Sequence, residues 1–208
     1  LAERERVNDM YELMHELGGD GVVVGVDEVG RGSVAGPLTV CAVCLPMEPR
    51  VWGINDSKKL TPARRELLSV KIAEVATAIG FCHIAPKDID EMGMARAIRA
   101  AVVGAVADTG LEPDCVLMDG NPLGAVPNER DVVKGDAKIA CIAAASIMAK
   151  VTRDEMMVEY DAEYPEYHLA ESKGYASPEH IEAIRKHGLC PLHRVSFCGN
   201  FLQTERLF

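Results

Sequence analysis

The chain of 208 residues is long enough for one sizeable hydrophobic core and short for two. Hydrophobic residues make up 48% and charged residues 26%, as in ordinary soluble domains, and no apolar run approaches the roughly 20 residues of a membrane span. The net charge of −10 argues against a protein that coats nucleic acid through a general cationic surface, but it permits an enzyme with a local cationic track.

The first 17 residues are charged and predict a helix that ends at Gly18 and Gly19. This segment lacks the apolar centre of a secretion signal, so we expect a cytoplasmic protein. The seven cysteines are scattered singly, apart from Cys41 and Cys44 in the stretch LTVCAVCL. That stretch predicts a buried strand, on which residues three apart point to opposite faces. No second pair completes a zinc site, so we interpret these cysteines as buried thiols.

Further along the chain, strand patterns alternate with helical ones. Strands are predicted at residues 22–27, 37–45, 81–85, 114–118 and 131–133. Helices are predicted at residues 61–78, 87–108, 139–160 and 177–188, with Thr61 and Ser177 as caps and irregular structure after them. This order predicts a single α/β domain over residues 1–208, in which residues from about 160 onward form a helical C-terminal part.

The stretch VVVGVDEVGRGSVAG, residues 22–36, fits a dinucleotide-binding pattern from Gly30 to Ala35. That pattern requires the glycines to open a helix whose N-terminus holds the pyrophosphate. Here Gly36 and Pro37 follow, and then a β-type run, so the next element is a strand. Asp27 and Glu28 would also repel a pyrophosphate. The dinucleotide reading is therefore disfavoured.

Carboxylates at predicted strand ends favour a metal site instead. Asp27 and Glu28 follow the first strand, Asp119 follows VLM, and Asp136 follows VVKG. Strand ends are where open α/β sheets place their ligands, and hard cations such as Mg²⁺ prefer oxygen ligands. Because neighbouring strand residues face opposite ways, Asp27 and Glu28 share a site only if regular strand geometry stops at about Asp27.

Four carboxylates can hold two divalent ions, which about 4 Å apart suit in-line displacement at phosphorus. The adjoining loop fits this chemistry. The amides of Gly30 and Gly32 can approach a nucleic-acid backbone closely, and Arg31 can bind phosphate. The residues therefore point to a metal-dependent phosphodiester hydrolase.

The chain also resembles bacterial ribonuclease HII. The segments that carry the resemblance occur in the family's order and are GVDEVGRGSVAGP, NDSKKL, VLMDGN, VVKGD, AAASIMAKVTRD, SKGY and HRVSF. The resemblance implies a ribonuclease H-like mixed β-sheet flanked by helices, with a helical C-terminal part. It implies an endonuclease that needs Mg²⁺ or Mn²⁺, cleaves the RNA strand of RNA–DNA hybrids and incises DNA at embedded ribonucleotides. Arg31 and the short N-terminus favour type HII over type HIII.

The resemblance also assigns residue roles. The catalytic, metal-binding quartet falls on Asp27, Glu28, Asp119 and Asp136, and the ribonucleotide-reading loop on Gly30, Arg31 and Gly32. Lys58 matches a substrate-binding lysine and Tyr175 a tyrosine that senses the RNA–DNA junction. Ser172, Gly93 and Val195 depart from the usual His, Asn and Arg of the family. We expect His168, His180 and His187, which show no ligand spacing, to be surface residues.

Two alternatives remain open from the residues. One is a hybrid-binding module without catalysis, which leaves the four carboxylates unexplained. The other is a different two-metal nuclease of the same fold class, such as a resolvase or an exonuclease. We expect a monomer. At the C-terminus, Gln203 followed by Leu207 and Phe208 resembles the tails that dock on the bacterial sliding clamp, although those apolar residues can equally pack onto the protein itself.

Overall fold

The structure is a computed structural model that describes residues 1–202, and it divides into two compact units. Unit 1 comprises residues 1–29, 39–82 and 98–151, and unit 2 comprises residues 30–38, 83–97 and the described residues from 152 onward. The expectation that residues 1–208 form a single domain stays a prediction, and the tail residues Gln203, Leu207 and Phe208 lie outside the described part of the chain.

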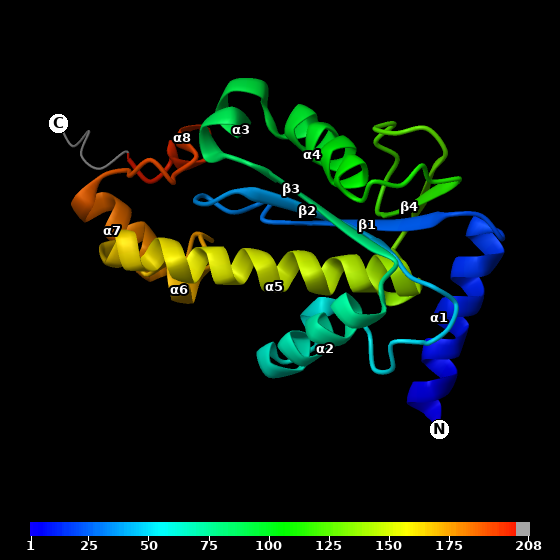
Figure 1. Cartoon of the computed structure of the whole chain (residues 1–208). Coiled ribbons are helices and arrows are strands. Elements are labelled where there is room, and N and C mark those ends of the chain that lie inside the picture. The colour runs from blue at the N-terminus through cyan, green and yellow to red at the C-terminus, as the bar shows by residue number, and fades with distance from the viewer. Residues whose placement is uncertain (203–208) are drawn as a thin grey trace. The chain divides into compact units, whose positions relative to one another are not determined.

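Within the described residues, the sheet has five strands in the order β3-β2-β1-β4-β5 (Figure 1). β1 pairs antiparallel with β2 and parallel with β4, and β4 pairs parallel with β5. The carboxyl ends of β1, β4 and β5 therefore meet at one edge of the sheet. This is the predicted mixed sheet, and the strands are β1 Val23–Val29, β2 Leu38–Cys44, β3 Ala78–Ile84, β4 Cys115–Asp119 and β5 Glu129–Val132.

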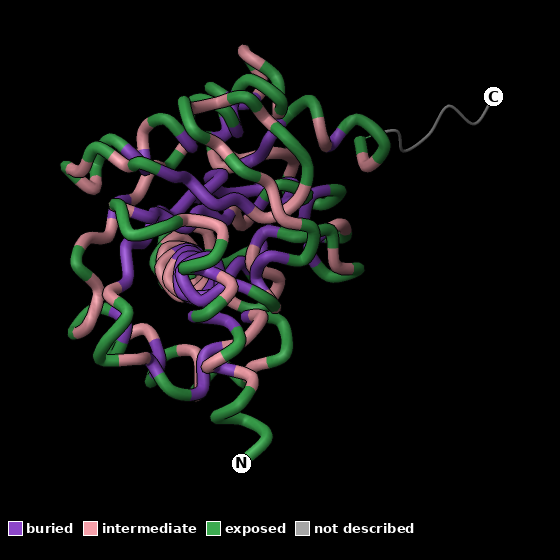
Figure 2. Tube along the Cα trace, turned by 90° about the vertical axis from the view of Figure 1, so that its right-hand side faces the viewer, coloured by how far each residue is buried: buried purple, intermediate pink, exposed green. Residues whose placement is uncertain are grey.

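Apolar side chains make β2 an interior strand. All seven of its residues are buried, and Cys41 and Cys44 are among them as free thiols. Burial raises the pKa of both thiols, so they stay protonated, as expected for buried cysteines. Figure 2 shows such buried stretches as purple trace among the exposed, green segments.

The helices follow the predicted patterns with one correction. The predicted helix over residues 87–108 is two helices, because Gly93 adopts φ 79° between them, a conformation that breaks helix geometry. Thr61 and Ser177 cap their helices as predicted, accepting from the N–H of Arg64 and His180. The helices are α1 Ala2–Gly18, α2 Pro62–Val75, α3 Pro86–Met92, α4 Met94–Asp108, α5 Ala140–Glu163, α6 Leu169–Ser172, α7 Pro178–His187 and α8 Val195–Cys198.

The core of unit 1 depends on a close approach between α5 and β1. A Cβ on Gly25 would lie 2.3 Å from the carbonyl carbon of Cys141 and 2.5 Å from the nitrogen of Ile142. Only glycine lets the first turn of α5 pack against the strand at this distance. Figure 1 shows the start of α5 on one face of the sheet and α4 on the other. α5 therefore begins directly beside the strand that carries Asp27.

Unit 2 has its own small core. It is built from the segment after Gly30, the second half of α5 and the helices that follow, with Val34, Ala35, Met157, Tyr167, Leu169 and Ile184 among its buried residues. Asp90 accepts from the backbone N–H of Val195 at 2.7 Å and so caps the short helix α8. The Val195 side chain itself is exposed. Among residues 1–202, every helix is too short or too polar to span a bilayer.

Candidate active site

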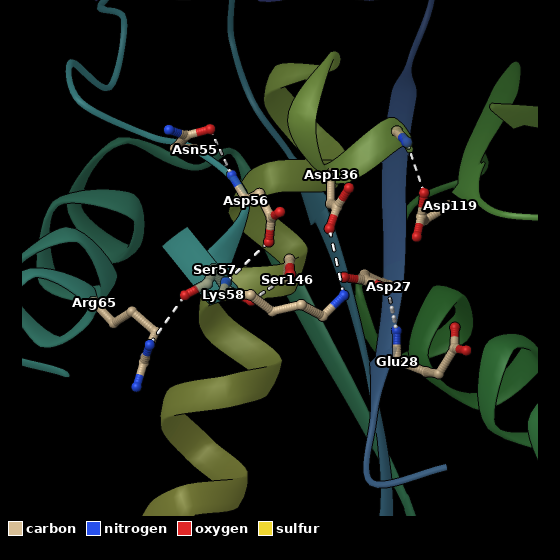
Figure 3. A network of polar contacts seen from close by, with 11 residues as sticks. Asp27, Glu28, Asn55, Asp56, Ser57, Lys58, Arg65, Asp119, Asp136 and Ser146 are labelled. Atoms are coloured by element: carbon tan, nitrogen blue, oxygen red, sulfur yellow. Dashed lines mark hydrogen bonds and ion pairs between the residues drawn. The ribbon is translucent and has the colours of Figure 1, made fainter. Parts of the chain in front are cut away.

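Asp27 and Glu28 lie on a strand that does not break where the sequence analysis expected. β1 continues to Val29, with Asp27 opposite Cys41 and Glu28 opposite Val40. The expectation of a break at Asp27 is wrong because antiparallel pairing with β2 holds the backbone extended; the chain turns at Gly30, where φ is 86°. Figure 3 shows the two side chains leaving β1 on different sides, Asp27 toward Asp136 and Glu28 on the side of Asp119.

Asp119 and Asp136 are held together by the backbone. Asp119 is the last residue of β4, and its Oδ1 accepts from the N–H of Gly135 at 2.6 Å. Asp136 lies in the 3₁₀ turn η2, Gly135–Ala137, which follows Lys134 in the left-handed conformation and leads into α5. The chain therefore brings the ends of two elements, 16 residues apart, to one point. Figure 3 shows this link beside Asp27.

The carboxylates influence one another electrostatically. Burial raises the pKa of Asp27 to about 8, and the negative charges of Glu28 and Asp119 add to the rise. Burial also raises the pKa of Asp136, with further contributions from Asp119 and Asp56. These couplings connect all four predicted site residues within unit 1. Such mutual repulsion favours proton uptake or the binding of a cation.

The donor set suits a hard divalent cation. It consists of carboxylate oxygens near the ends of β1 and β4 and in η2, partly withdrawn from water, which is the chemistry that Mg²⁺ and Mn²⁺ prefer. Within residues 1–202, no three Asp, Glu, His or Cys side chains converge closely enough in this conformation to enclose an ion. The residues therefore fit such an ion by chemistry and charge.

Lys58 supplies a positive charge at the site. Its Nζ lies 3.7 Å from Oδ2 of Asp136 although the side chain is 81% exposed. Burial lowers the pKa of Lys58, but the charges of Asp136 and Asp27 outweigh that effect and raise it. The lysine stays protonated. The structure thus places the Lys58 ammonium beside Asp136, and its substrate-binding role stays a prediction.

Two residues beside the quartet escaped the sequence analysis. Asp56 accepts from the N–H of Lys58 at 2.9 Å and caps the turn η1, Ser57–Lys59. Ser146 on α5 shares a hydrogen bond of 2.9 Å with Ser57 and lowers the pKa of Asp27 by hydrogen bonding. An Asp directly before Ser-Lys-Lys is a recognisable cap signal, and a lone hydroxyl in the run AAASIMA is a recognisable polar insertion.

The loop after Asp119 is also held by a carboxylate. Glu129 at the start of β5 accepts from four successive backbone N–H groups, at 2.6 Å from Leu123, 2.8 Å from Gly124, 2.7 Å from Ala125 and 3.4 Å from Val126. Burial alone would raise its pKa, but these four hydrogen bonds lower it. Glu129 therefore keeps the chain between β4 and β5 in one conformation and keeps Asp119 at its end.

The Gly30–Gly32 loop lies in unit 2. Gly30 turns the chain with φ 86°, and its carbonyl accepts from the Ser33 hydroxyl at 2.9 Å. Arg31 and Gly32 are exposed, and the Arg31 carbonyl accepts from Nη1 of Arg194 at 3.2 Å. Hydrogen bonds from Ser33 and Arg194 therefore hold the backbone of the loop, while Arg31 and Gly32 face solvent, where a ligand can reach them.

Arg153 organises this loop from the inside. It is completely buried, and its guanidinium donates to the carbonyls of Pro37 at 2.9 Å and Ala35 at 3.1 Å and to the Ser33 hydroxyl at 2.8 Å. A further bond of 2.8 Å reaches the carbonyl of Lys173. One side chain thus connects the segment after the glycines with a second turn, which carries Tyr175.

Tyr175 lies at that second turn, and its side chain is 40% exposed. The Arg153 guanidinium carbon lies 5.7 Å from the centre of its ring. Ser172, one of the departures from the family pattern, accepts from the Tyr175 N–H through its carbonyl at 2.9 Å and from the Gly174 N–H through its hydroxyl at 3.2 Å. Unit 2 therefore brings Tyr175 and the Gly30–Gly32 loop onto one framework.

Comparison with known sequences shows clear relatives. A family model described as Ribonuclease HII matches residues 24–200. A protein named ribonuclease HII from Moorella thermoacetica is 47% identical over 198 residues, which cover 94% of this chain and 96% of that protein. Another, from Ruminiclostridium cellulolyticum, is 44% identical over 204 residues, which cover 97% of this chain and 80% of that protein.

Comparison with solved structures shows the same fold. Ribonuclease H2 from Pyrococcus horikoshii has a TM-score of 0.74 at 28% identity, covering 88% of this chain and 99% of that one. A PCNA:RNase HII complex from Archaeoglobus fulgidus has a TM-score of 0.72 at 24% identity, and the match covers 84% of this chain and 94% of that one. A structure of Bst-RNase HIII with Mn²⁺ has a TM-score of 0.71 at 20% identity, and the match covers 91% of this chain and 70% of that one. These neighbours confirm the ribonuclease H-like fold.

Proposed function

The chain belongs to the ribonuclease HII family of nucleases that act on RNA–DNA hybrids, and from that premise we propose that it also incises duplex DNA on the 5′ side of embedded ribonucleotides. Hydrolysis leaves a 3′-hydroxyl and a 5′-phosphate. In the cell this reaction starts the removal of ribonucleotides from DNA. The observation that carries the proposal is the electrostatic coupling of Asp27, Glu28, Asp119 and Asp136 in unit 1.

We assign two divalent ions, Mg²⁺ or Mn²⁺, to these four carboxylates. Glu28 leaves the unbroken strand β1 on a different side from Asp27, so its place in the set rests on the family resemblance and on its electrostatic effect on Asp27. Two such ions activate a water and stabilise the leaving oxygen when they are bound. The raised pKa values of Asp27 and Asp136 support the assignment, because positive charge relieves the repulsion that causes part of each rise. The Bst-RNase HIII neighbour, which shares the fold, contains Mn²⁺. The choice between the two metals is left to the assay.

The other predicted site residues bind the substrate. The backbone of Gly30, Arg31 and Gly32 contacts the 2′-hydroxyl, the group that distinguishes RNA from DNA, and Arg31 and Gly32 are exposed. The Arg31 guanidinium binds a phosphate of the substrate. The positively charged Lys58 binds the phosphate that lies at the carboxylates. Tyr175 stacks on the sugar that follows the ribonucleotide. The framework of Arg153 supports this assignment, since it ties the loop and the tyrosine to one side chain.

A cleavage assay tests the proposal. The substrates are a labelled DNA duplex with one ribonucleotide, the same duplex without it, and an RNA–DNA hybrid, each with EDTA, Mg²⁺ or Mn²⁺. We expect cleavage of the first and third substrates with metal only, and a product that a DNA polymerase extends from its 3′ end. Tight binding without cleavage in either metal would instead support the hybrid-binding module, and cleavage of the all-DNA duplex would support another nuclease.

We propose that the C-terminal residues 203–208 bind the bacterial sliding clamp. Gln203, Leu207 and Phe208 resemble a clamp-docking tail, and the Archaeoglobus fulgidus neighbour was solved in complex with PCNA. These residues lie outside the described part of the chain. A fluorescent peptide of residues 203–208 should bind purified bacterial clamp, and the full chain should bind it more tightly than a chain ending at residue 202. Equal affinity of the two chains for the clamp eliminates this partner.

We place the protein in the bacterial cytoplasm as a monomer. The genome, where hybrids and embedded ribonucleotides arise, lies in that compartment, and the relatives named above are bacterial. Light scattering of the purified chain measures its mass in solution. A stable dimer would contradict the monomer.

A further inference from the structure

Two buried histidines of unit 2 lie end to end. His180 on α7 is completely buried and His193 is 3% exposed, and their Nε2 atoms are 3.1 Å apart. The expectation that His180 is a surface residue is wrong. Ser177 caps α7 three residues earlier, and the helix then turns His180 toward the interior of unit 2. Two ring nitrogens at this distance attract only if one of them carries a hydrogen and the other does not.

The partners at both ends determine which nitrogen carries it. Nδ1 of His180 lies 2.9 Å from the Tyr175 carbonyl, which only accepts, so this nitrogen donates. In a neutral ring Nε2 of His180 is then bare and accepts from Nε2–H of His193. Nδ1 of His193 is in turn bare, and it accepts from the backbone N–H of Cys190 at 3.0 Å and faces the Cys190 thiol at 3.2 Å. Every donor meets an acceptor only when both rings are neutral.

The surroundings keep both rings neutral. Burial lowers the pKa of His180, and burial together with the charge of His180 lowers the pKa of His193 to about 4. The titratable groups that face the pair are His168, which also lowers the pKa of His180, and the Tyr167 ring and Cys190. The carboxylate of Glu166 raises the pKa of Tyr167 and of Cys190, next to the pair.

The chain of hydrogen bonds ends on the turn that carries Tyr175. Three successive carbonyls of this turn are engaged: that of Lys173 by Arg153, that of Gly174 by the N–H groups of Val34 and Ala35, and that of Tyr175 by His180 and the N–H of Ser177. At the other end, His193 forms a β-bridge with Ala35, just after the Gly30–Gly32 loop. The two histidines therefore link Ala35, which follows the Gly30–Gly32 loop, to the carbonyl of Tyr175.

We infer that His180 and His193 are positioning residues for Tyr175: their one-directional hydrogen-bond chain fixes the tyrosine's carbonyl and so the place of its ring. The inference rests on the proposed role of Tyr175 at the ribonucleotide. A proton added to either ring would set two N–H groups face to face and break the chain. Cleavage at a single ribonucleotide should then fall on acidification more steeply than cleavage of a hybrid, in which the tyrosine has no junction to recognise.

The first experiment measures the tautomers without any activity. The full chain, labelled with ¹⁵N-histidine, is observed at about pH 7.5, where an unperturbed histidine is mostly neutral, by NMR correlation of ring nitrogens with ring protons. Signals are assigned with His180→Asn and His193→Gln. We expect a neutral His180 with its hydrogen on Nδ1 and a neutral His193 with its hydrogen on Nε2. A cationic ring, or His180 with its hydrogen on Nε2, overturns the inference.

The second experiment compares variants of His180. Leucine removes the donor to the Tyr175 carbonyl, whereas the amide of asparagine can donate from the position of Nδ1 without titrating. Kinetics on single-ribonucleotide and hybrid substrates from about pH 7.5 down to about pH 4.5 give kcat and KM separately; the range extends below the ordinary histidine pKa because burial lowers the pKa of both rings. His187→Asn is the matched control, since His187 is an exposed histidine on the same helix. Thermal melts report whether each variant folds.

We expect His180→Leu to lower kcat for the single ribonucleotide about 10-fold relative to the hybrid, the lower end of what orienting partners contribute. His180→Asn should retain most of that activity and should flatten the pH dependence of the ratio between substrates. His187→Asn should match the wild type. The inference is contradicted if His180→Leu leaves the ratio of kcat between the two substrates unchanged, or if His180→Asn lowers that ratio as much as His180→Leu does. If His180→Leu does not fold, the kinetics of His180→Asn and the measured tautomers test the inference.

Tyr175→Ala separates this inference from the proposed function. If Tyr175→Ala impairs single-ribonucleotide cleavage while His180→Leu does not, the positioning role is wrong and the role of the tyrosine stands. If Tyr175→Ala itself cleaves like the wild type, the proposed role of the tyrosine is wrong, and the positioning function is overturned with it. The tautomer measurement still shows in that case whether the hydrogen-bond chain exists.

Discussion

The backbone N–H of Gly135 donates to Oδ1 of Asp119 across 2.6 Å and so joins the end of β4 to the turn that carries Asp136. A Cβ at position 135 would lie 2.6 Å from Cδ1 of Ile142, so the end of that side chain would have to shift to make room for it. One oxygen of Asp119 is thereby held by the protein, and the other is left for a ligand. Asp119 is thus oriented before any substrate arrives, as a metal ligand should be.

Asp119→Asn should abolish most cleavage while the protein stays folded. The amide keeps the size of the side chain and one oxygen, but it loses the negative charge that a cation needs. Residues that merely orient metal ligands contribute about 10–100-fold, so a direct ligand should cost at least about 100-fold in kcat. Cleavage of a hybrid in Mg²⁺ and Mn²⁺ measures this. Asp20→Asn, a fully exposed aspartate, is the control, and near-normal activity of Asp119→Asn would remove that residue from the site.

Gly25→Ala should destabilise unit 1. The added Cβ would meet the backbone of Cys141 and Ile142 at 2.3 and 2.5 Å, and backbone cannot rotate away as a side chain can. Overpacking of this kind costs about 1–3 kcal/mol, and we expect the upper end of that range in the free energy of unfolding by urea. Gly199→Ala should be neutral within about 0.5 kcal/mol, because nothing lies within 4 Å of its Cβ position and φ is −53°.

Arg153→Lys should cost about 2 kcal/mol of stability and impair discrimination of the single ribonucleotide. A lysine ammonium cannot reach the carbonyls of Pro37 and Lys173 and the Ser33 hydroxyl together, so buried acceptors lose their partners. Urea unfolding and the ratio of cleavage on the two substrates measure the two effects. Arg185→Lys, at an exposed position of α7, should behave as the wild type. An unchanged substrate ratio in Arg153→Lys would show that the framework serves stability alone.

Glu129→Gln should lower stability at neutral pH by about 1 kcal/mol, a moderate value because the residue is only partly buried. The folded state lowers the pKa of Glu129, so its contribution is complete above the unfolded pKa of about 4.5 and is lost as the pH falls through the lower folded value. The difference between wild type and variant should therefore shrink in acid. Urea unfolding from about pH 7 to pH 3 measures it, and a difference independent of pH would contradict the four-bond anchor.

The sequence alone located most of the elements and proposed the chemistry of the site. Apolar runs located a strand such as β2 because a strand buried on both faces is apolar throughout, and the Thr61 and Ser177 caps marked helix starts because a side-chain oxygen there satisfies a free N–H group. The carboxylates were recognisable because each ends an apolar run, where a charge has no reason to lie unless it serves a ligand.

Only the tertiary structure decided how far β1 runs and which polar residues are buried. Pairing with β2 carries β1 through Glu28 to Val29, and that depends on a neighbouring strand rather than on local preference. Arg153 and His180 look like surface residues in sequence because a charged or titratable side chain normally stays in water. Their burial is possible only because carbonyls, the Ser33 hydroxyl 120 residues away and a second histidine give each of their buried nitrogens a partner.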